Sequence, residues 1–104
     1  MAKPALDIDI FGTRYDIFRQ SRVTVDGEAA DGYCENPRLY TPGRNKKLIV
    51  RRALRGRALC ETLCHELLHA FDFDKKEEYV EHAGQVLAEV LTHPEFEDLI
   101  YYHA

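Results

Sequence analysis

The sequence predicts an α+β fold, in which a small N-terminal antiparallel β-sheet packs on a pair of antiparallel helices and a short C-terminal helix follows. Short runs of alternating or β-branched apolar residues fill the first half of the chain. Two longer stretches with 3.6-residue apolar spacing come next, and only a few residues separate them. With 104 residues, 45% of them hydrophobic, the chain has the size of a single domain, residues 1–104.

The predicted strands lie in the N-terminal half of the chain. Residues 6–18 alternate apolar and polar side chains on both sides of Gly12, which predicts one strand or a bent pair. The dipeptides Asp26-Gly27 and Asp31-Gly32 are turn signals. Residues 20–36 are therefore expected to form a hairpin or a meander.

The helices follow after a loop and one more strand. Proline and glycine in residues 36–43 predict loops, and the apolar residues 48–50 predict a strand. Helices are expected over residues 56–73, 77–91 and 95–102. Because so few residues connect the first two helices, these must be antiparallel neighbours. The apolar stripe of the first helix consists of Leu59, Cys60, Leu63, Cys64, Leu67, Ala70 and Phe71.

The first predicted helix carries the run His65-Glu66-Leu67-Leu68-His69, which is the candidate metal site. Residues four apart on an α-helix differ by about 40° in direction and about 6 Å in height, so both imidazoles can bind one zinc ion. Glu66 lies about 60° from His69 and about 100° from His65, where it can reach a water on that ion but is a poor third ligand. We therefore expect His65 and His69 to bind the metal and Glu66 to act as the general base.

A catalytic zinc site needs at least one more protein ligand, and the second helix must supply it. Facing positions on the two helices have numbers that sum to about 149, so the level midway between the histidines lies opposite residue 82. Glu81 lies at this level on the edge of the packing face and is the favoured third ligand. Glu77, Glu78 and His82 are the alternatives, although the helix dipole also explains an acidic residue at Glu77.

Other polar residues have structural explanations at least as good as functional ones. Cys60 and Cys64 lie on the apolar stripe, so packing as small hydrophobic residues is favoured over metal binding. Asp72 could orient a ligand imidazole or could solvate the end of the helix. Packing or surface exposure is favoured over stabilisation of an oxyanion for Tyr33, Tyr40, Tyr101, Tyr102 and His103.

Charge and composition narrow the class of protein. The formal net charge of −4 argues against nucleic acid as a partner. No apolar run approaches the roughly 18 residues of a membrane span, and no secretory leader is recognisable. The three cysteines form no Cys-x-x-Cys pair, which fits a reducing compartment. A solvated surface is also the favoured explanation for the basic residues Arg44, Lys46, Lys47, Arg51, Arg52, Arg55 and Arg57, because no aromatic residues alternate with them.

The segment 61–71 resembles the active-site helix of zincin metallopeptidases, and the segment 77–83 is similar to the glutamate helix of the gluzincin branch. The order of a small β segment and then a helix pair resembles the small metallopeptidases of bacteriophages and prophages and, more distantly, the ImmA/IrrE and SprT-like groups. The short connection between the helices departs from this pattern and leaves open which glutamate is the third ligand. The resemblance implies a peptidase in the cytoplasm of a bacterial or phage-infected cell.

The expected activity is hydrolysis of a peptide bond by a zinc-activated water, with the zinc held by His65, His69 and Glu81 and the proton moved by Glu66. A peptide or protein substrate would lie along a sheet edge beside residues 48–51. The alternative is a binding or structural module in which the metal only staples the helix pair, since so short a chain has little material for a substrate cleft.

Overall fold

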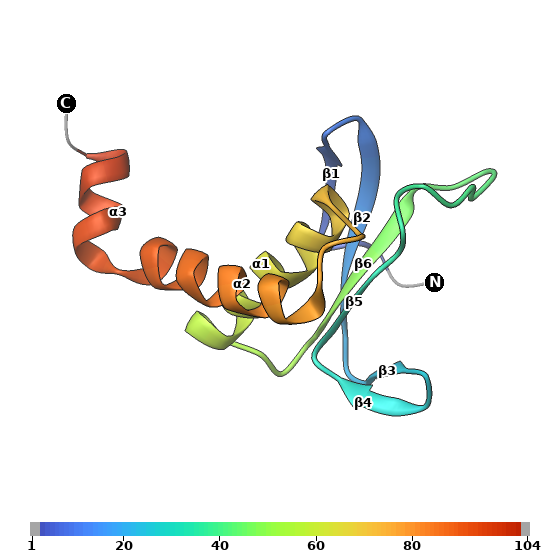
Figure 1. The fold of residues 1–104 in the computed structure, drawn as a ribbon, viewed down its shortest axis with the longest axis horizontal. Coiled ribbons are helices and arrows are strands. Elements are labelled where there is room, and N and C mark those ends of the chain that lie inside the picture. Colours follow the sequence, from blue (N-terminus) through green and yellow to red (C-terminus); the bar gives the residue numbers. More distant parts are fainter. Residues whose placement is uncertain (1–2, 103–104) are drawn as a thin grey trace.

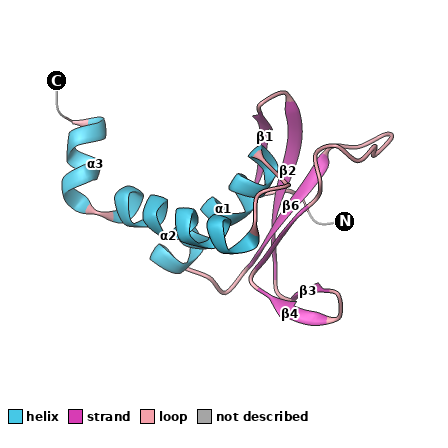
Figure 2. Cartoon of the chain, viewed as in Figure 1, coloured by secondary structure: helices cyan, strands magenta, loops and turns pink. Residues whose placement is uncertain are grey.

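The computed structural model describes residues 3–102 and confirms the α+β fold (Figures 1 and 2). The sheet lies at one end of the molecule in Figure 1, α1 and α2 lie in the middle, and α3 stands at the other end. The elements of the described chain are β1 (Leu6–Ile10), β2 (Thr13–Gln20), β3 (Val23–Val25), β4 (Glu28–Ala30), β5 (Gly32–Cys34), β6 (Lys46–Arg51), α1 (Gly56–Phe71), α2 (Glu77–Thr92) and α3 (Pro94–Tyr101).

Four strands form a sheet in the order β1-β2-β6-β5. The predicted antiparallel pairing holds for β1 with β2 and for β5 with β6, whereas β2 and β6 run parallel. Residues 6–18 form a pair of strands rather than one, because Phe11 and Gly12 adopt positive φ angles of 49° and 88° at the turn between β1 and β2. β6 is therefore an internal strand, and β1 and β5 are the edges of this sheet.

The predicted meander over residues 20–36 is also present. Asp26 and Gly27 have φ angles of 53° and 81°, the left-handed conformation that an Asp-Gly hairpin turn needs, and they join β3 to β4. The chain bends again at Asp31, but Gly32 is not a turn residue, because it begins β5.

The helices match their predicted ranges within two residues. α1 ends at Phe71 because Asp72 leaves the helical conformation, with φ −144° and ψ 89°. α3 begins with Pro94, which suits the first helical position because it has no N–H to satisfy. The imidazole of His93 caps this helix by accepting a hydrogen bond from the backbone N–H of Glu95.

The core lies between one face of the sheet and α1. Its buried residues are Tyr15, Ile17, Cys34, Leu48, Val50 and Ala70, and apolar side chains of α1 pack against them. α2 packs on α1 through its buried face of Val80, Gly84 and Ala88. A Cβ atom at Gly84 would lie only 3.3 Å from the backbone nitrogen of His65, so glycine lets the two helices approach closely.

No helix within residues 3–102 is long and apolar enough to cross a membrane. The basic cluster does not form one open surface. Arg44, Arg51 and Arg57 make ion pairs with Glu35, Asp31 and Glu89, and Lys46 is buried. The three ion-paired arginines lie on the surface, as the sequence predicts, whereas Lys46 departs from the predicted solvated surface because it is buried.

Candidate metal centre

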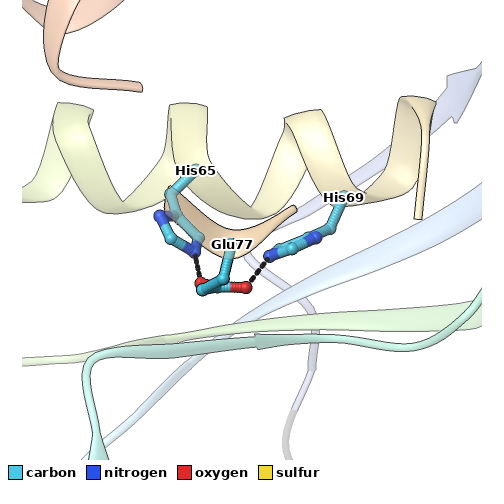
Figure 3. Close-up of side chains that lie close together, drawn as sticks. All are labelled: His65, His69 and Glu77. Atoms are coloured by element: carbon cyan, nitrogen blue, oxygen red, sulfur yellow. Dashed lines mark hydrogen bonds and ion pairs between the residues drawn. The ribbon is translucent and has the colours of Figure 1, made fainter. Parts of the chain in front are cut away.

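His65 and His69 lie one turn apart on α1 and point to the same side of the helix (Figure 3). Their ring centroids are 5.0 Å apart and the rings meet edge to face. The side chains are only 22% and 13% exposed, so most of each ring is covered by the protein. The spacing therefore brings the two imidazoles together as the sequence predicts.

The carboxylate that joins them is that of Glu77, the first residue of α2. Its Oε1 lies 2.5 Å from Nε2 of His65, and its Oε2 lies 2.9 Å from Nε2 of His69. Figure 3 shows this carboxylate lying between the two rings. Glu77 follows the connection at residues 72–76, where the chain reverses direction between α1 and α2. This reversal brings Glu77 beside the two histidines.

Glu81, the ligand that the sequence favours, is not part of this group among the described residues. It lies one turn further along α2 and lines the same cavity. The two helices face each other as estimated, because Gly84 packs on the backbone of His65. The difference between the two glutamates is one of level, because residues four apart on α2 face nearly the same way and Glu77 lies one turn nearer the connection between the helices. In the structure it is the alternative, Glu77, whose carboxylate meets both histidines.

The donor set fits a zinc ion. Two imidazole nitrogens and one carboxylate oxygen lie within 4.8 Å of one another. Three protein ligands of these types are typical of catalytic zinc, whose fourth position is open. Nδ1 of His69 is buried and has no hydrogen-bond partner in the part of the chain that the structure describes. The polar contact that orients this ring is therefore the one between its Nε2 and Glu77.

Asp72 does not supply that partner. Its carboxylate accepts a hydrogen bond from the backbone N–H of Asp74, and its own backbone N–H bonds to Leu68. Within the described residues Asp72 therefore does not orient a histidine, and it lies at the C-terminal end of α1.

Glu66 is almost fully buried, with 7% of its surface exposed, although it is a carboxylic acid. Burial raises the pKa of Glu66 to about 7; the nearby charge of His65 opposes this rise and that of Glu77 adds to it. A general base works best when its pKa lies near the working pH. The position beside the histidines and the raised pKa both suit the predicted base.

Gly32 of β5 packs directly against this carboxylate. A Cβ atom at Gly32 would lie 2.9 Å from Cγ and from Oε2 of Glu66 and 2.9 Å from Cγ2 of Thr62. Such distances are shorter than van der Waals contact, so no other residue fits there unless Glu66 moves. The glycine therefore sets the position of Glu66 from the side of the sheet.

Replacing Gly32 with alanine tests this contact. We expect a loss of about 1–3 kcal/mol in the free energy of unfolding, the usual cost of overpacking, measured by urea denaturation. Adding Glu66→Ala to the Gly32→Ala variant should recover part of the loss, because the overlapping side chain is gone. Additive losses in the double variant would show that Glu66 is not what the new methyl group meets.

A cavity of about 630 Å³ opens in front of the histidines. Its walls come from α1, from the first turns of α2 and from β5. The lining includes His65, His69, Glu66, Glu77, Glu81, Gly32, Tyr33 and Cys34. Despite the short chain, there is a hollow at the site large enough for part of a peptide.

The edge of the sheet at this cavity is β5, not residues 48–51. The expected edge was wrong because residues 48–51 belong to β6, which pairs with β2 on one side and β5 on the other. At the two ends of β5, the backbone N–H of Arg51 donates a hydrogen bond to the carbonyl of Asp31, and the backbone N–H of Glu35 donates one to the carbonyl of Lys47. Because alternate residues of an antiparallel strand face their partner, the main-chain groups of Gly32 and Cys34 face away from β6.

The remaining candidates from the sequence are the cysteines, four tyrosines and His103. Cys64 is buried, and burial with the neighbouring Cys60 raises its pKa to about 11, so it remains a packed thiol. All three cysteines are free. Tyr33 lines the cavity at 41% exposure, whereas three other tyrosines are exposed elsewhere: Tyr40, Tyr101 and Tyr102. His103 lies outside the described residues.

No protein-family model, curated protein or solved structure matches this chain.

Proposed function

We propose that this chain is a zinc-dependent peptide hydrolase of the gluzincin type, with His65, His69 and Glu77 as zinc ligands and Glu66 as general base. The observation that carries the proposal is the convergence of both Nε2 atoms on one carboxylate beside a buried glutamate. A pair of histidines can occur by chance on a surface helix, and an acidic residue in a first turn is explained by the helix dipole. Neither explanation accounts for the meeting of His65, His69 and Glu77 in one cavity.

The roles of the residues follow from their environments. A zinc ion held by His65, His69 and Glu77 would supply Lewis acidity and would lower the pKa of its water to about 7. Glu66 accepts the proton of the attacking water and returns it to the leaving amine. Its burial under Gly32 keeps bulk water away from the carboxylate, and its raised pKa suits both steps of the proton transfer.

The substrate in this proposal is an extended peptide that adds to the edge of β5. Such a peptide would pair with the main-chain N–H and C=O groups of Gly32, which face away from β6 at the edge of the sheet, as in other cases of strand addition. Such pairing reads the backbone, so we expect little sequence selectivity from the edge itself. We place the protein in the cytoplasm of a bacterial or phage-infected cell, in keeping with its three free thiols.

The test is cleavage of a mixture of unstructured peptides, followed by mass spectrometry. We expect cleavage by the zinc-loaded chain, loss of cleavage after treatment with a chelator, and recovery when zinc is added back. Cleavage that persists in the chelator would contradict the proposal, because the activity would then not need the metal.

A second function has one specific observation in its favour. Glu77 comes from α2 and the histidines come from α1, so a bound metal would also clamp the two helices. A module stapled in this way would gain stability from zinc without hydrolysing peptides. Coordination separates the two functions: a water as fourth ligand fits the hydrolase, and a fourth protein ligand fits the staple.

A further inference from the structure

The helix α3 has almost no support from the rest of the chain. It packs against α2, and none of its residues is buried. Figure 1 shows it standing away from the sheet and from α1. An isolated helix of eight residues is too short to be stable in water unless packing sustains it. The proline at its first position and the cap from His93 favour its start but provide no such packing.

One face of α3 is apolar and open to solvent. Phe96, Leu99 and Ile100 lie at positions i, i+3 and i+4, and they are 42%, 59% and 51% exposed. At about 100° per residue, Glu95 lies next to Leu99 on one side of this stripe and Glu97 lies next to Ile100 on the other. We call these five residues the α3 face. It has an apolar centre and an acidic rim, as an interface for another polypeptide has.

Charge is strongly segregated along the sequence. All 14 lysines and arginines and 11 of the 18 acidic residues precede Glu77, so residues 1–76 carry a formal charge of +3 and residues 77–104 carry −7. Within the described residues, Glu95, Glu97 and Asp98 make no ion pair. Within residues 3–102, the rim of the α3 face therefore has no ion-pair partner.

We infer that the α3 face binds a basic amphipathic segment of another protein, whose apolar side covers Phe96, Leu99 and Ile100 and whose lysines or arginines meet Glu95 and Glu97. Charge decides the occupant. A second copy meeting face to face would place like charges opposite one another, and a nucleic acid or an anionic lipid surface would be repelled. A helix with basic residues beside an apolar stripe complements both parts of the face.

The experiment measures binding of the full chain to a fluorescein-labelled synthetic helix of leucine and lysine, by fluorescence anisotropy. A matched helix with glutamate in place of lysine is the control peptide. We expect the lysine helix to bind at least about tenfold more tightly, and the double variant Leu99→Ser/Ile100→Ser to weaken it about tenfold or more. The double variant Glu95→Gln/Glu97→Gln should weaken binding and reduce its dependence on salt.

Two matched variants show whether the face itself is responsible. Asp98 lies on the side of α3 opposite the apolar stripe. Leu39 is an exposed leucine outside α3, in the loop between β5 and β6. Asp98→Asn and Leu39→Ser should leave the affinity within about twofold, as surface changes outside an interface do. Equal binding of both peptides, or equal effects of all the variants, would overturn the inference. A concentration-dependent dimer that Leu99→Ser/Ile100→Ser abolishes would also overturn it, because the occupant would then be a second copy.

Discussion

Replacing Glu66 with glutamine is expected to lower the rate of peptide hydrolysis by about 10²–10⁴-fold and to leave zinc binding almost unchanged. Glutamine has nearly the same shape, so it fits under Gly32, but its amide cannot accept the proton of the attacking water. The three residues of the proposed zinc site, His65 and His69 on α1 and Glu77 on α2, are unchanged in this variant and should keep their positions. The measurement is kcat on a cleaved peptide at saturating zinc, with zinc affinity obtained by competition against a chromophoric chelator.

Glu61→Gln is the matched control for this variant. Glu61 lies on α1 one turn before His65 and lines the same cavity, but it is more exposed than Glu66 and does not contact Gly32. We expect its removal to change kcat by less than about threefold, since it carries no proton in the proposed reaction. A Glu66→Gln enzyme that still cleaves at the original rate would mean that another group takes the proton.

The sequence predicts local features of this fold well, because their causes are local. The apolar spacing of residues 56–73 and 77–91 gives two helices that match the structure within two residues. Asp26-Gly27 gives the hairpin turn because its φ angles are a property of the dipeptide. The pairing of His65 and His69 also follows from spacing on a single helix.

Features that depend on tertiary geometry could not be predicted in the same way. The parallel pairing of β2 with β6 joins strands about 30 residues apart, and it makes β6 internal and β5 the edge. Gly32 looks like a turn glycine in sequence, whereas its lack of a side chain is needed where β5 meets Glu66. Its place five residues before the loop proline and directly beside Tyr33 and Cys34 is a signal that it could belong to a strand.

The position of Glu77 shows the limit of the sum rule. The rule correctly places Gly84 opposite His65, but the long side chain of Glu77 reaches the histidines from one turn nearer the connection than Glu81. The sequence favours Glu81 over Glu77 because Glu77 lies nearer that connection, where the helix dipole already explains an acidic residue. That explanation does not compete with metal binding, since one carboxylate can do both.

Replacing Glu77 with glutamine is expected to weaken zinc binding about 100-fold or more, which corresponds to about 2.8 kcal/mol, whereas Glu81→Gln should change it by less than about threefold. The reason is that, in the part of the chain that the structure describes, Glu77 alone brings carboxylate oxygens to both imidazoles. The measurement is zinc affinity by competition, supported by the rise in melting temperature that zinc produces in each variant.

Glu78→Gln separates ligation from the helix dipole, because Glu78 lies in the same first turn of α2 and is not in the metal group. Its loss should cost about 0.3–1 kcal/mol of stability and should not change zinc affinity. If Glu81→Gln instead abolishes binding while Glu77→Gln retains it, Glu81 is the third ligand, as the sequence favours, and the side chains of α2 rearrange when zinc binds. If neither variant changes binding, the two histidines bind without a carboxylate from α2, and the three-ligand site proposed here is wrong.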